Sequence, residues 1–257
     1  MPDRLSAPKS AELISRFSAD LVNCDTVDGC WSLLTATICQ FGFDRMMFGL
    51  NSIRSDGQPE PISDALVLFW GEPEYVDRYL DEGHYYSSPL IKWAITHRGA
   101  ISWHQAASQL DPQPLTPERI RFQQLLADFK LSAGYFLSLA DVDSHVMSVL
   151  SLGARVGLTQ TDADRVWAEH GSSIELAARL FYLRVSTLPR SGQCRPLTSR
   201  QKETLRWIGA GKTAREIAQI MDVTPATIEK HLQRARESLK VVSTAQAVQK
   251  ATRLNLI

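Results

Sequence analysis

The C-terminal part of the chain repeats one local signal, and this signal constrains the fold more than any other feature. Four segments with helical periodicity are each preceded by a residue with a hydroxyl side chain: Thr198, Thr213, Thr224 and Ser243. Three of the four have Gln or Glu three residues later, which is the pattern of a capping box, and the fourth is followed by Pro225, a favoured first helical residue. We therefore predict four short helices with brief turns in residues 197–257.

The second and third of these predicted helices are separated by a tight turn at residues 222–223. This spacing is typical of a helix-turn-helix, whose second helix lies in the major groove of DNA. On a helical wheel, one stripe of that helix is apolar: Ile228, Leu232, Ala235 and Leu239. Its other face is polar, and it suits either contacts with DNA or plain exposure to solvent on a four-helix bundle.

The polar face carries residue types that hydrogen-bond to base edges or to phosphates. We predict DNA contacts along the recognition helix from Thr224, Ala226, Thr227, Lys230, Gln233 and Arg234. We expect Lys212, Arg215 and Arg236 to be better placed for phosphates.

The charges of the chain are distributed unevenly between its two parts. Lys plus Arg and Asp plus Glu each number 28 in the whole chain. Residues 191–257 hold 12 basic and 5 acidic residues, a net charge of +7, and residues 1–190 hold 16 and 23, a net charge of −7. Such asymmetry indicates a basic module that meets a polyanion, although solubility alone also produces it.

Other patterns exclude several classes of protein. No apolar segment approaches the roughly 20 residues that cross a bilayer, and the N-terminus lacks the apolar core of a signal peptide, so we expect a cytoplasmic protein without membrane contact. The four cysteines lack C-x-x-C spacing and are expected to be reduced thiols, with a redox-sensing cysteine as the alternative. Because the common catalytic motifs are absent, we predict no catalytic residue, no metal site and no cofactor.

With 257 residues, the chain has room for two ordinary domains. Pro189, Gly192 and Pro196 mark a linker, so we predict a domain in 1–185, a linker in 186–196 and the helical domain in 197–257. The fold class is α+β: an α/β/α sandwich on an antiparallel sheet, then an all-α four-helix helix-turn-helix domain. The elements expected in the first domain are two helices in 10–41, strands at 45–50 and 65–70, helices at 72–82 and 88–97 joined by a loop at 83–88, a strand at 100–103, a helix at 116–129, a hairpin of 135–140 and 146–153 around a turn at 141–144, and a helix at 162–184.

Residues 197–257 resemble the DNA-binding domain of LuxR-type transcription factors. The residues that carry the resemblance are Leu197, Glu203, Leu205, Gly211, Lys212, Thr213, Glu216, Ile217, Ala218, Val223, Thr227, Lys230 and Leu239. The resemblance implies that the last helix helps to dimerise the domain on a near-palindromic site. It implies double-stranded DNA, a second copy of the chain and RNA polymerase as partners.

The order of elements in residues 10–185 resembles the autoinducer-binding domain of quorum-sensing LuxR-type receptors, in which an acyl-homoserine lactone lies between the sheet and helices. Tyr79, Pro89, Trp103 and Gly134 match the family pattern, and Ser151 matches a small hydroxyl residue of its pocket. Three positions depart from it. At the position of Gly71, beside Trp70, the family has a tyrosine that binds the acyl carbonyl. At the position of Tyr75 it has a tryptophan that binds the lactone carbonyl, and at the position of Ser88 it has an aspartate that accepts the amide N–H.

The resemblance predicts a ligand site formed by Trp70, Tyr75, Tyr79, Ser88, Trp103 and Ser151, with Tyr85 or Tyr86 near it. The alternative is that these aromatic residues only fill a core. Serine accepts a hydrogen bond more weakly than a carboxylate, so the ligand is either an acyl-homoserine lactone or another small apolar signal molecule. Three hypotheses stay open: a ligand-gated DNA-binding regulator, a ligand-independent regulator with a non-functional pocket, and an enzyme fused to a DNA-binding domain.

Overall fold

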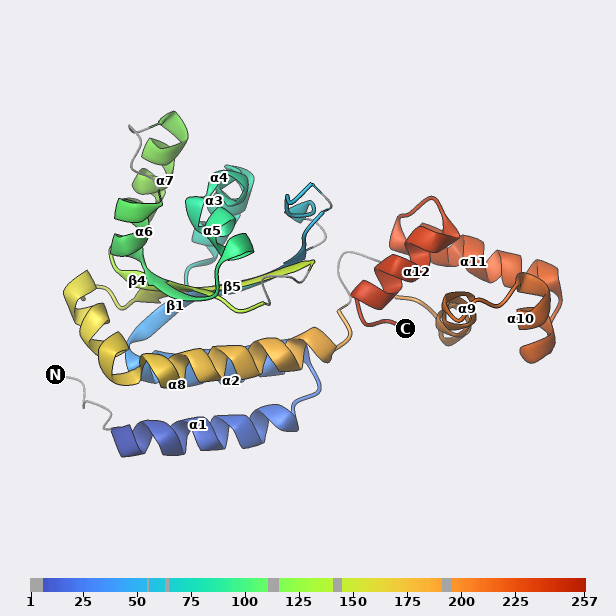
Figure 1. Cartoon of the computed structure of the whole chain (residues 1–257), viewed down its shortest axis with the longest axis horizontal. Coiled ribbons are helices and arrows are strands. Elements are labelled where there is room, and N and C mark those ends of the chain that lie inside the picture. Colours follow the sequence, from blue (N-terminus) through green and yellow to red (C-terminus); the bar gives the residue numbers. More distant parts are fainter. Residues whose placement is uncertain (1–6, 55, 63–64, 111–115, 141–144, 191–195) are drawn as a thin grey trace. The chain divides into compact units, whose positions relative to one another are not determined.

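The structure is a computed structural model that describes residues 7–54, 56–62, 65–110, 116–140, 145–190 and 196–257 (Figure 1). The chain divides into two compact units, Met1–Ser186 and Thr187–Ile257. We call them the N-terminal unit and the C-terminal unit and describe each by itself.

The N-terminal unit is built on one antiparallel sheet of five strands in the order β2-β1-β5-β4-β3. The strands are β1 Phe43–Ser52, β2 Leu66–Trp70, β3 Gly99–Ser102, β4 Gly134–Ser138 and β5 Val146–Ala154. The helices are α1 Ala7–Val22, α2 Val27–Ile38, the 3-10 helix η1 Cys39–Phe41, α3 Pro73–Asp81, α4 His84–Ser87, α5 Pro89–Thr96, α6 Trp103–Gln109, α7 Pro117–Asp128 and α8 Gln160–Thr187. The predicted α/β/α sandwich on an antiparallel sheet is confirmed.

Helices cover both faces of this sheet, as Figure 1 shows, with α1, α2 and α8 on one side and α3 to α7 on the other. On the α8 side, Phe48 of β1 packs edge-on against Phe181 of α8 at 5.0 Å between ring centroids. Trp31 of α2 completes this group at 5.7 Å from the Phe181 ring. Because successive strand residues point to opposite faces, the neighbours of Phe48 point to the other helical layer.

The strand register lines up one row of side chains on that other face. Met47 of β1 pairs with Phe69 of β2 and with Ser151 of β5, and the row continues through β4 to β3. In sheet order the row is Phe69, Met47, Ser151, Phe136 and Ile101. One hydroxyl therefore lies in an otherwise apolar row, below the helices α3 to α7.

Two sequence expectations in this layer are wrong. Residues 84–87 of the expected loop form the short helix α4. The expected strand at 100–103 ends at Ser102, because Ser102 and Gln105 make a capping box and Trp103 begins α6, a helix that the sequence analysis did not predict. The expected turn at 141–144 and the side chain of Tyr86 lie outside the described residues.

The C-terminal unit is helical, as predicted. Its helices are α9 Ser199–Gly209, α10 Ala214–Ile220, α11 Pro225–Leu239 and α12 Thr244–Arg253. Thr198, Thr213 and Ser243 form the three predicted capping boxes, and the Thr224 hydroxyl caps α11. The predicted apolar stripe of α11 is confirmed, since Ile228, Leu232, Ala235 and Leu239 are at most 4% exposed. In the described part of the chain, no helix combines the length and the apolar character that crossing a membrane requires.

Candidate functional sites

A small cavity opens in the N-terminal unit between the sheet row described above and the helices that cover it. Its volume is about 20 Å³, room for about one water molecule. Its lining comes from five separate stretches of chain: Arg45, Met46, Met47, Phe69, Glu72, Tyr75, Trp103, Phe129, Leu131, Ser151 and Gly153. We call this site the pocket.

Local sequence signals place the polar side chains of the pocket. Pro73 occupies the first turn of α3 and sets the helix that carries Tyr75. The capping box at Ser102 starts α6 and directs Trp103 over the sheet. Gly134 makes room for this indole, because a Cβ at Gly134 would lie 2.7 Å from Trp103 Cε2 and 2.1 Å from the carbonyl oxygen of Leu152. The close approach of Trp103 to β4 therefore requires glycine.

Three hydrogen-bond donors of the pocket have no partner among the described residues. They are the phenol of Tyr75, the hydroxyl of Ser151 and the indole N–H of Trp103, which is shielded from solvent. Burial raises the pKa of Tyr75, so its phenol stays protonated and can donate. Of the three, the Trp103 indole N–H is the one that is fully buried, and a buried donor in a native protein almost always has an acceptor, so this position fits a carbonyl or another acceptor on a small molecule.

Two charged residues lie at the edge of the pocket. The Arg45 guanidinium donates to the carbonyl oxygens of Phe129 at 3.0 Å and Lys130 at 3.2 Å, and to that of Ala154. Arg45 therefore joins the end of α7 to the end of β5. Glu72 is exposed at the N-cap of α3, and the described residues offer its carboxylate no ion pair.

The structure brings together three of the six ligand residues that the sequence indicated, namely Tyr75, Trp103 and Ser151. Tyr79 lies behind Tyr75, stacked on it at 6.0 Å. Within the described part of the chain, the lining does not include Trp70, which is 45% exposed, or Ser88, a half-buried N-cap residue whose side chain makes no capping hydrogen bond. Tyr85 is a core residue, and its phenol accepts from Asn51 Nδ2 at 3.3 Å.

Gly71 occupies the position where the resemblance would place tyrosine. Its φ of +140° lies in a region that glycine favours. A Cβ there would lie 3.0 Å from Phe69 Cζ and 3.2 Å from Arg45 Cγ. The side chains of Phe69 and Arg45, two pocket residues, would therefore have to shift to admit a Cβ at this position.

Sequence reasoning missed most of the apolar lining. Met47, Phe69 and Gly153 share the sheet face of Ser151, and the alternation of residues along paired strands would have pointed to them once the strand register was known. Phe129 and Leu131 lie just after α7 and carry no recognisable pattern.

The second candidate site is the exposed face of the helix-turn-helix formed by α10 and α11. The turn between them contains Asp222 with a φ of +52°, and the N–H of Val223 donates to the carbonyl of Ala218 at 3.0 Å. Lys230, Gln233 and Arg234 of α11 are exposed, as the helical wheel predicted. We call this face the recognition surface.

The exposed cations of the recognition surface differ in their partners. Lys230, Arg234 and Arg215 have no ion pair among the described residues. Lys212 lies 3.9 Å from Glu216, whose pKa is lowered by hydrogen bonds from the backbone and hydroxyl of Thr213. The first three cations are therefore free to meet phosphates or base edges.

Other predicted DNA residues already have partners within the C-terminal unit. Thr224 and Thr227 share a hydroxyl hydrogen bond of 2.9 Å at the start of α11, where Ala226 is exposed. Gln233 donates to Glu237 at 3.0 Å. Arg236 is half-buried and donates to the Thr244 hydroxyl at 2.9 Å, so it joins α11 to α12.

Two families of known proteins match the two units. Residues 26–185 match the family described as "Autoinducer binding domain". Residues 195–251 match "Bacterial regulatory proteins, luxR family". Both families belong to transcriptional regulators, not to enzymes.

The chain is also similar to individual proteins, over 70% to 100% of its length. It is 30% identical to the "HTH-type quorum sensing-dependent transcriptional regulator RpaR" of Rhodopseudomonas palustris, over 99% of this chain and 91% of that protein. Its fold matches "SdiA in complex with octanoyl-rac-glycerol" with a TM-score of 0.55, 16% identity and coverage of 100% of this chain and 98% of that one. It also matches the N-acylhomoserine lactone dependent LuxR family factor CepR2 of Burkholderia cenocepacia, with a TM-score of 0.53, 18% identity and coverage of 70% and 98%.

Proposed function

The chain belongs to the luxR family of bacterial regulatory proteins with an autoinducer-binding domain, and from this we propose that it is a ligand-gated transcriptional regulator. In this proposal the pocket binds an acyl-homoserine lactone or a related apolar small molecule in the cytoplasm. The liganded protein binds a near-palindromic DNA operator as a dimer and acts there on RNA polymerase.

The observation that carries the proposal is the trio of partnerless donors in the pocket. The buried indole N–H of Trp103 needs an acceptor, and Tyr75 and Ser151 can donate to the same ligand. The aromatic and thioether side chains around them suit an acyl or other apolar group. The row across the sheet has its single hydroxyl at Ser151, so the polar end of a ligand is favoured there.

A stripe on α8 supports dimerisation. Leu176 is 48% exposed and Leu183 is 59% exposed, with the half-buried Leu180 between them. Spacings of four and three residues place the three leucines on one helical face. A second copy of the chain offers the same stripe, and a two-fold protein fits a near-palindromic site.

The second candidate is a ligand-independent regulator of the same architecture. The observation that favours it is the size of the pocket, because 20 Å³ holds no acyl chain without movement of the lining. The two candidates differ in whether a ligand opens the pocket.

Calorimetric titration of the full chain with N-octanoyl-homoserine lactone and with octanoylglycerol tests the proposal. Trp103→Phe removes the indole N–H together with part of the packed ring, and we expect at least about fivefold weaker binding of the preferred probe, the value of one hydrogen bond, with the lost packing adding to it. Trp207→Phe in the C-terminal unit is the matched control and is expected to bind like wild type. Ser88 lies outside the lining of the small pocket, so Ser88→Asp tests whether a bound lactone extends to it. We propose that it does, and we expect tighter binding of the lactone only, because a carboxylate accepts its amide N–H more strongly than a serine hydroxyl.

Two outcomes would contradict this. If neither probe binds saturably while the protein still binds a duplex selected from a random pool, the ligand-independent candidate replaces the proposal. If Ser88→Asp leaves lactone affinity unchanged or lower, Ser88 does not stand at an amide-binding position.

A further inference from the structure

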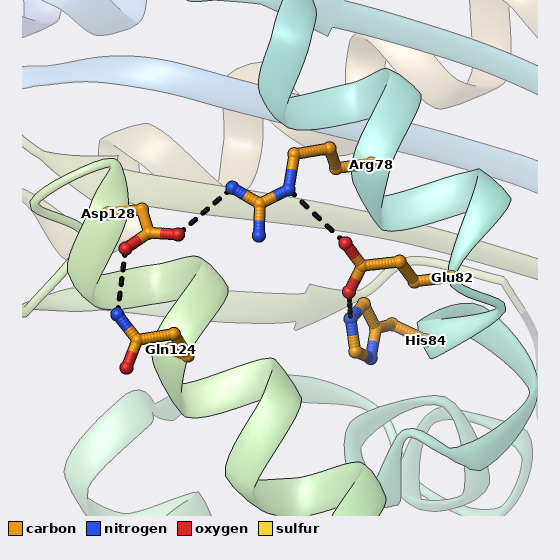
Figure 2. A network of polar contacts seen from close by, with 5 residues as sticks. All are labelled: Arg78, Glu82, His84, Gln124 and Asp128. Atoms are coloured by element: carbon orange, nitrogen blue, oxygen red, sulfur yellow. Dashed lines mark hydrogen bonds and ion pairs between the residues drawn. The ribbon is translucent and has the colours of Figure 1, made fainter.

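A polar network lies beside the pocket and joins three helices of the layer that covers it (Figure 2). Arg78 of α3 makes two ion pairs, through Nε with Glu82 Oε1 at 3.2 Å and through a terminal nitrogen with Asp128 Oδ2 at 2.9 Å. Asp128 is the last residue of α7, and Glu82 follows α3 directly. We call Arg78, Glu82 and Asp128 the Arg78 clasp.

Both carboxylates of the clasp are held by further partners. Gln124 donates to Asp128 Oδ1 at 2.8 Å, which leaves Oδ2 for Arg78. His84 of α4 lies with Nε2 at 2.9 Å from Glu82 Oε2. As Figure 2 shows, the two carboxylates face Arg78 from opposite sides, so one guanidinium connects α3 and α7.

The clasp acts on two walls of the pocket. Tyr75 lies three residues before Arg78 on α3, and Phe129 lies one residue after Asp128. The rings of Tyr75 and Phe129 meet edge-on at 5.5 Å, and the Arg78 guanidinium lies over the Phe129 ring at 5.8 Å. Arg78 therefore pairs with the carboxylate of Asp128, the neighbour of Phe129 in sequence, and also lies over the Phe129 ring.

We propose that Arg78 is a positioning residue that keeps the pocket closed by holding Phe129 against Tyr75. A ligand reaches the three donors when the Phe129 ring moves away from the Tyr75 ring. The Arg78 clasp determines how frequently this movement occurs. The inference rests on the proposed ligand site, but the clasp itself can be tested without any ligand.

Loss of the clasp is expected to change rates more than affinity. An opening that precedes ligand passage in both directions raises the association and dissociation rates together, while contacts with the bound ligand stay the same. A merely structural loss would instead lower the free energy of unfolding of the whole N-terminal unit.

Hydrogen exchange of the full chain without ligand is the first measurement. In Arg78→Met and Asp128→Asn, we expect amides of α3 and α7 to exchange about fivefold faster, in line with the loss of a partly exposed ion pair, and amides of β1 and β5 to stay as in wild type. Arg121→Met is the matched control, because among the described residues the ion pair of Arg121 is with Glu118 on α7 itself, at 3.6 Å. The proposal would be overturned if the α7 amides of Arg78→Met exchanged at the wild-type rate. It would also be overturned if exchange became faster uniformly, in the sheet as well as in the helices.

Stopped-flow binding of N-octanoyl-homoserine lactone is the second measurement. Arg78→Met is expected to raise both rate constants about fivefold with a smaller change in Kd, and Arg78→Lys, which keeps the charge but not the fork, is expected to fall between it and wild type. Equal rates in wild type and Arg78→Met would overturn the proposal and leave the ligand site intact. If wild type binds no probe, the ligand site fails instead, and the exchange experiment alone decides the clasp.

Discussion

The recognition surface and the pocket are built in opposite ways. The recognition surface comes from two consecutive helices, α10 and α11. Its side chains are mostly exposed, and the partners they have lie within four residues, as Glu237 does for Gln233. The pocket comes from segments between β1 and β5, more than a hundred residues apart, and its side chains are packed against each other.

This difference teaches how each site responds to change. A substitution on an exposed helix face removes one contact with a partner and leaves the fold alone. A substitution in the pocket moves neighbours on other strands and helices, because a packed interior transmits volume changes. The following experiments test whether the two units differ in this way.

The largest effect is expected at Gly134, where β4 meets Trp103. Gly134→Ala places a Cβ against the Leu152 carbonyl and the indole ring. We expect it to lower the free energy of unfolding by about 1–3 kcal/mol, as overpacking does, and to weaken ligand binding as well. Urea unfolding of the full chain, followed by near-UV circular dichroism, measures this.

Gly209→Ala in α9 is the matched control, since its Cβ would meet only Val248 Cγ1 at 3.4 Å. Alanine favours helix over glycine, so we expect no loss of stability. If both variants behave alike, the contrast between the two units is wrong.

An effect of similar size, but confined to DNA binding and without loss of stability, is expected on the recognition surface. Lys230→Ala should reduce discrimination between operator and random duplex by about 1–3 kcal/mol if Lys230 contacts a base. Arg215→Ala should weaken binding to all duplexes alike and reduce the salt slope by about 1. Gel-shift titrations at several salt concentrations separate the two, and intact discrimination in Lys230→Ala would show that the wheel assignment is wrong.

The smallest effect is expected from acid on the Arg78 clasp. Hydrogen bonds from Gln124 and then Arg78 lower the pKa of Asp128, and those from His84 and then Arg78 lower that of Glu82. A lowered pKa in the folded state stabilises above the ordinary carboxyl pKa, and this stabilisation is lost as the pH falls through the lowered value. After correction for the intrinsic pH dependence of exchange, the hydrogen-exchange rates of α3 and α7 amides in wild type and Asp128→Asn should therefore differ most near neutral pH and converge below about pH 4.

Asp77→Asn controls for the loss of one negative charge on α3, because Asp77 has no ion pair among the described residues. A difference in α3 and α7 exchange between Asp128→Asn and wild type that is as large at pH 3 as at pH 7 would contradict the assignment.

Most of the C-terminal unit could be predicted from sequence, for a physical reason. Capping boxes, the Pro225 signal and a 3.6-residue period act within a few residues, so they are visible in the chain itself. The helical wheel did not predict which polar side chains hydrogen-bond to each other within the unit. Arg236 bonds to Thr244, and Gln233 bonds to Glu237.

In the N-terminal unit, the sequence indicated the elements but not their contacts. Ser151 was found through the family resemblance, yet its neighbours Met47 and Phe69 depend on strand register, which hairpin turns and burial decide together. The helix α6 was missed although Ser102 and Gln105 carry the capping signal, because Trp103 and the preceding apolar residues suggested a strand. The Arg78 clasp joins residues 50 positions apart and left no sequence pattern.

Gly71 also limits how the pocket can be redesigned. Its φ of +140° is one that residues with a Cβ rarely adopt, and a Cβ there would lie 3.0 Å from Phe69 Cζ and 3.2 Å from Arg45 Cγ. A larger residue at this position therefore requires the local backbone to change and both neighbouring side chains to shift. Variants meant to alter ligand preference are expected to be better tolerated at other positions of the lining.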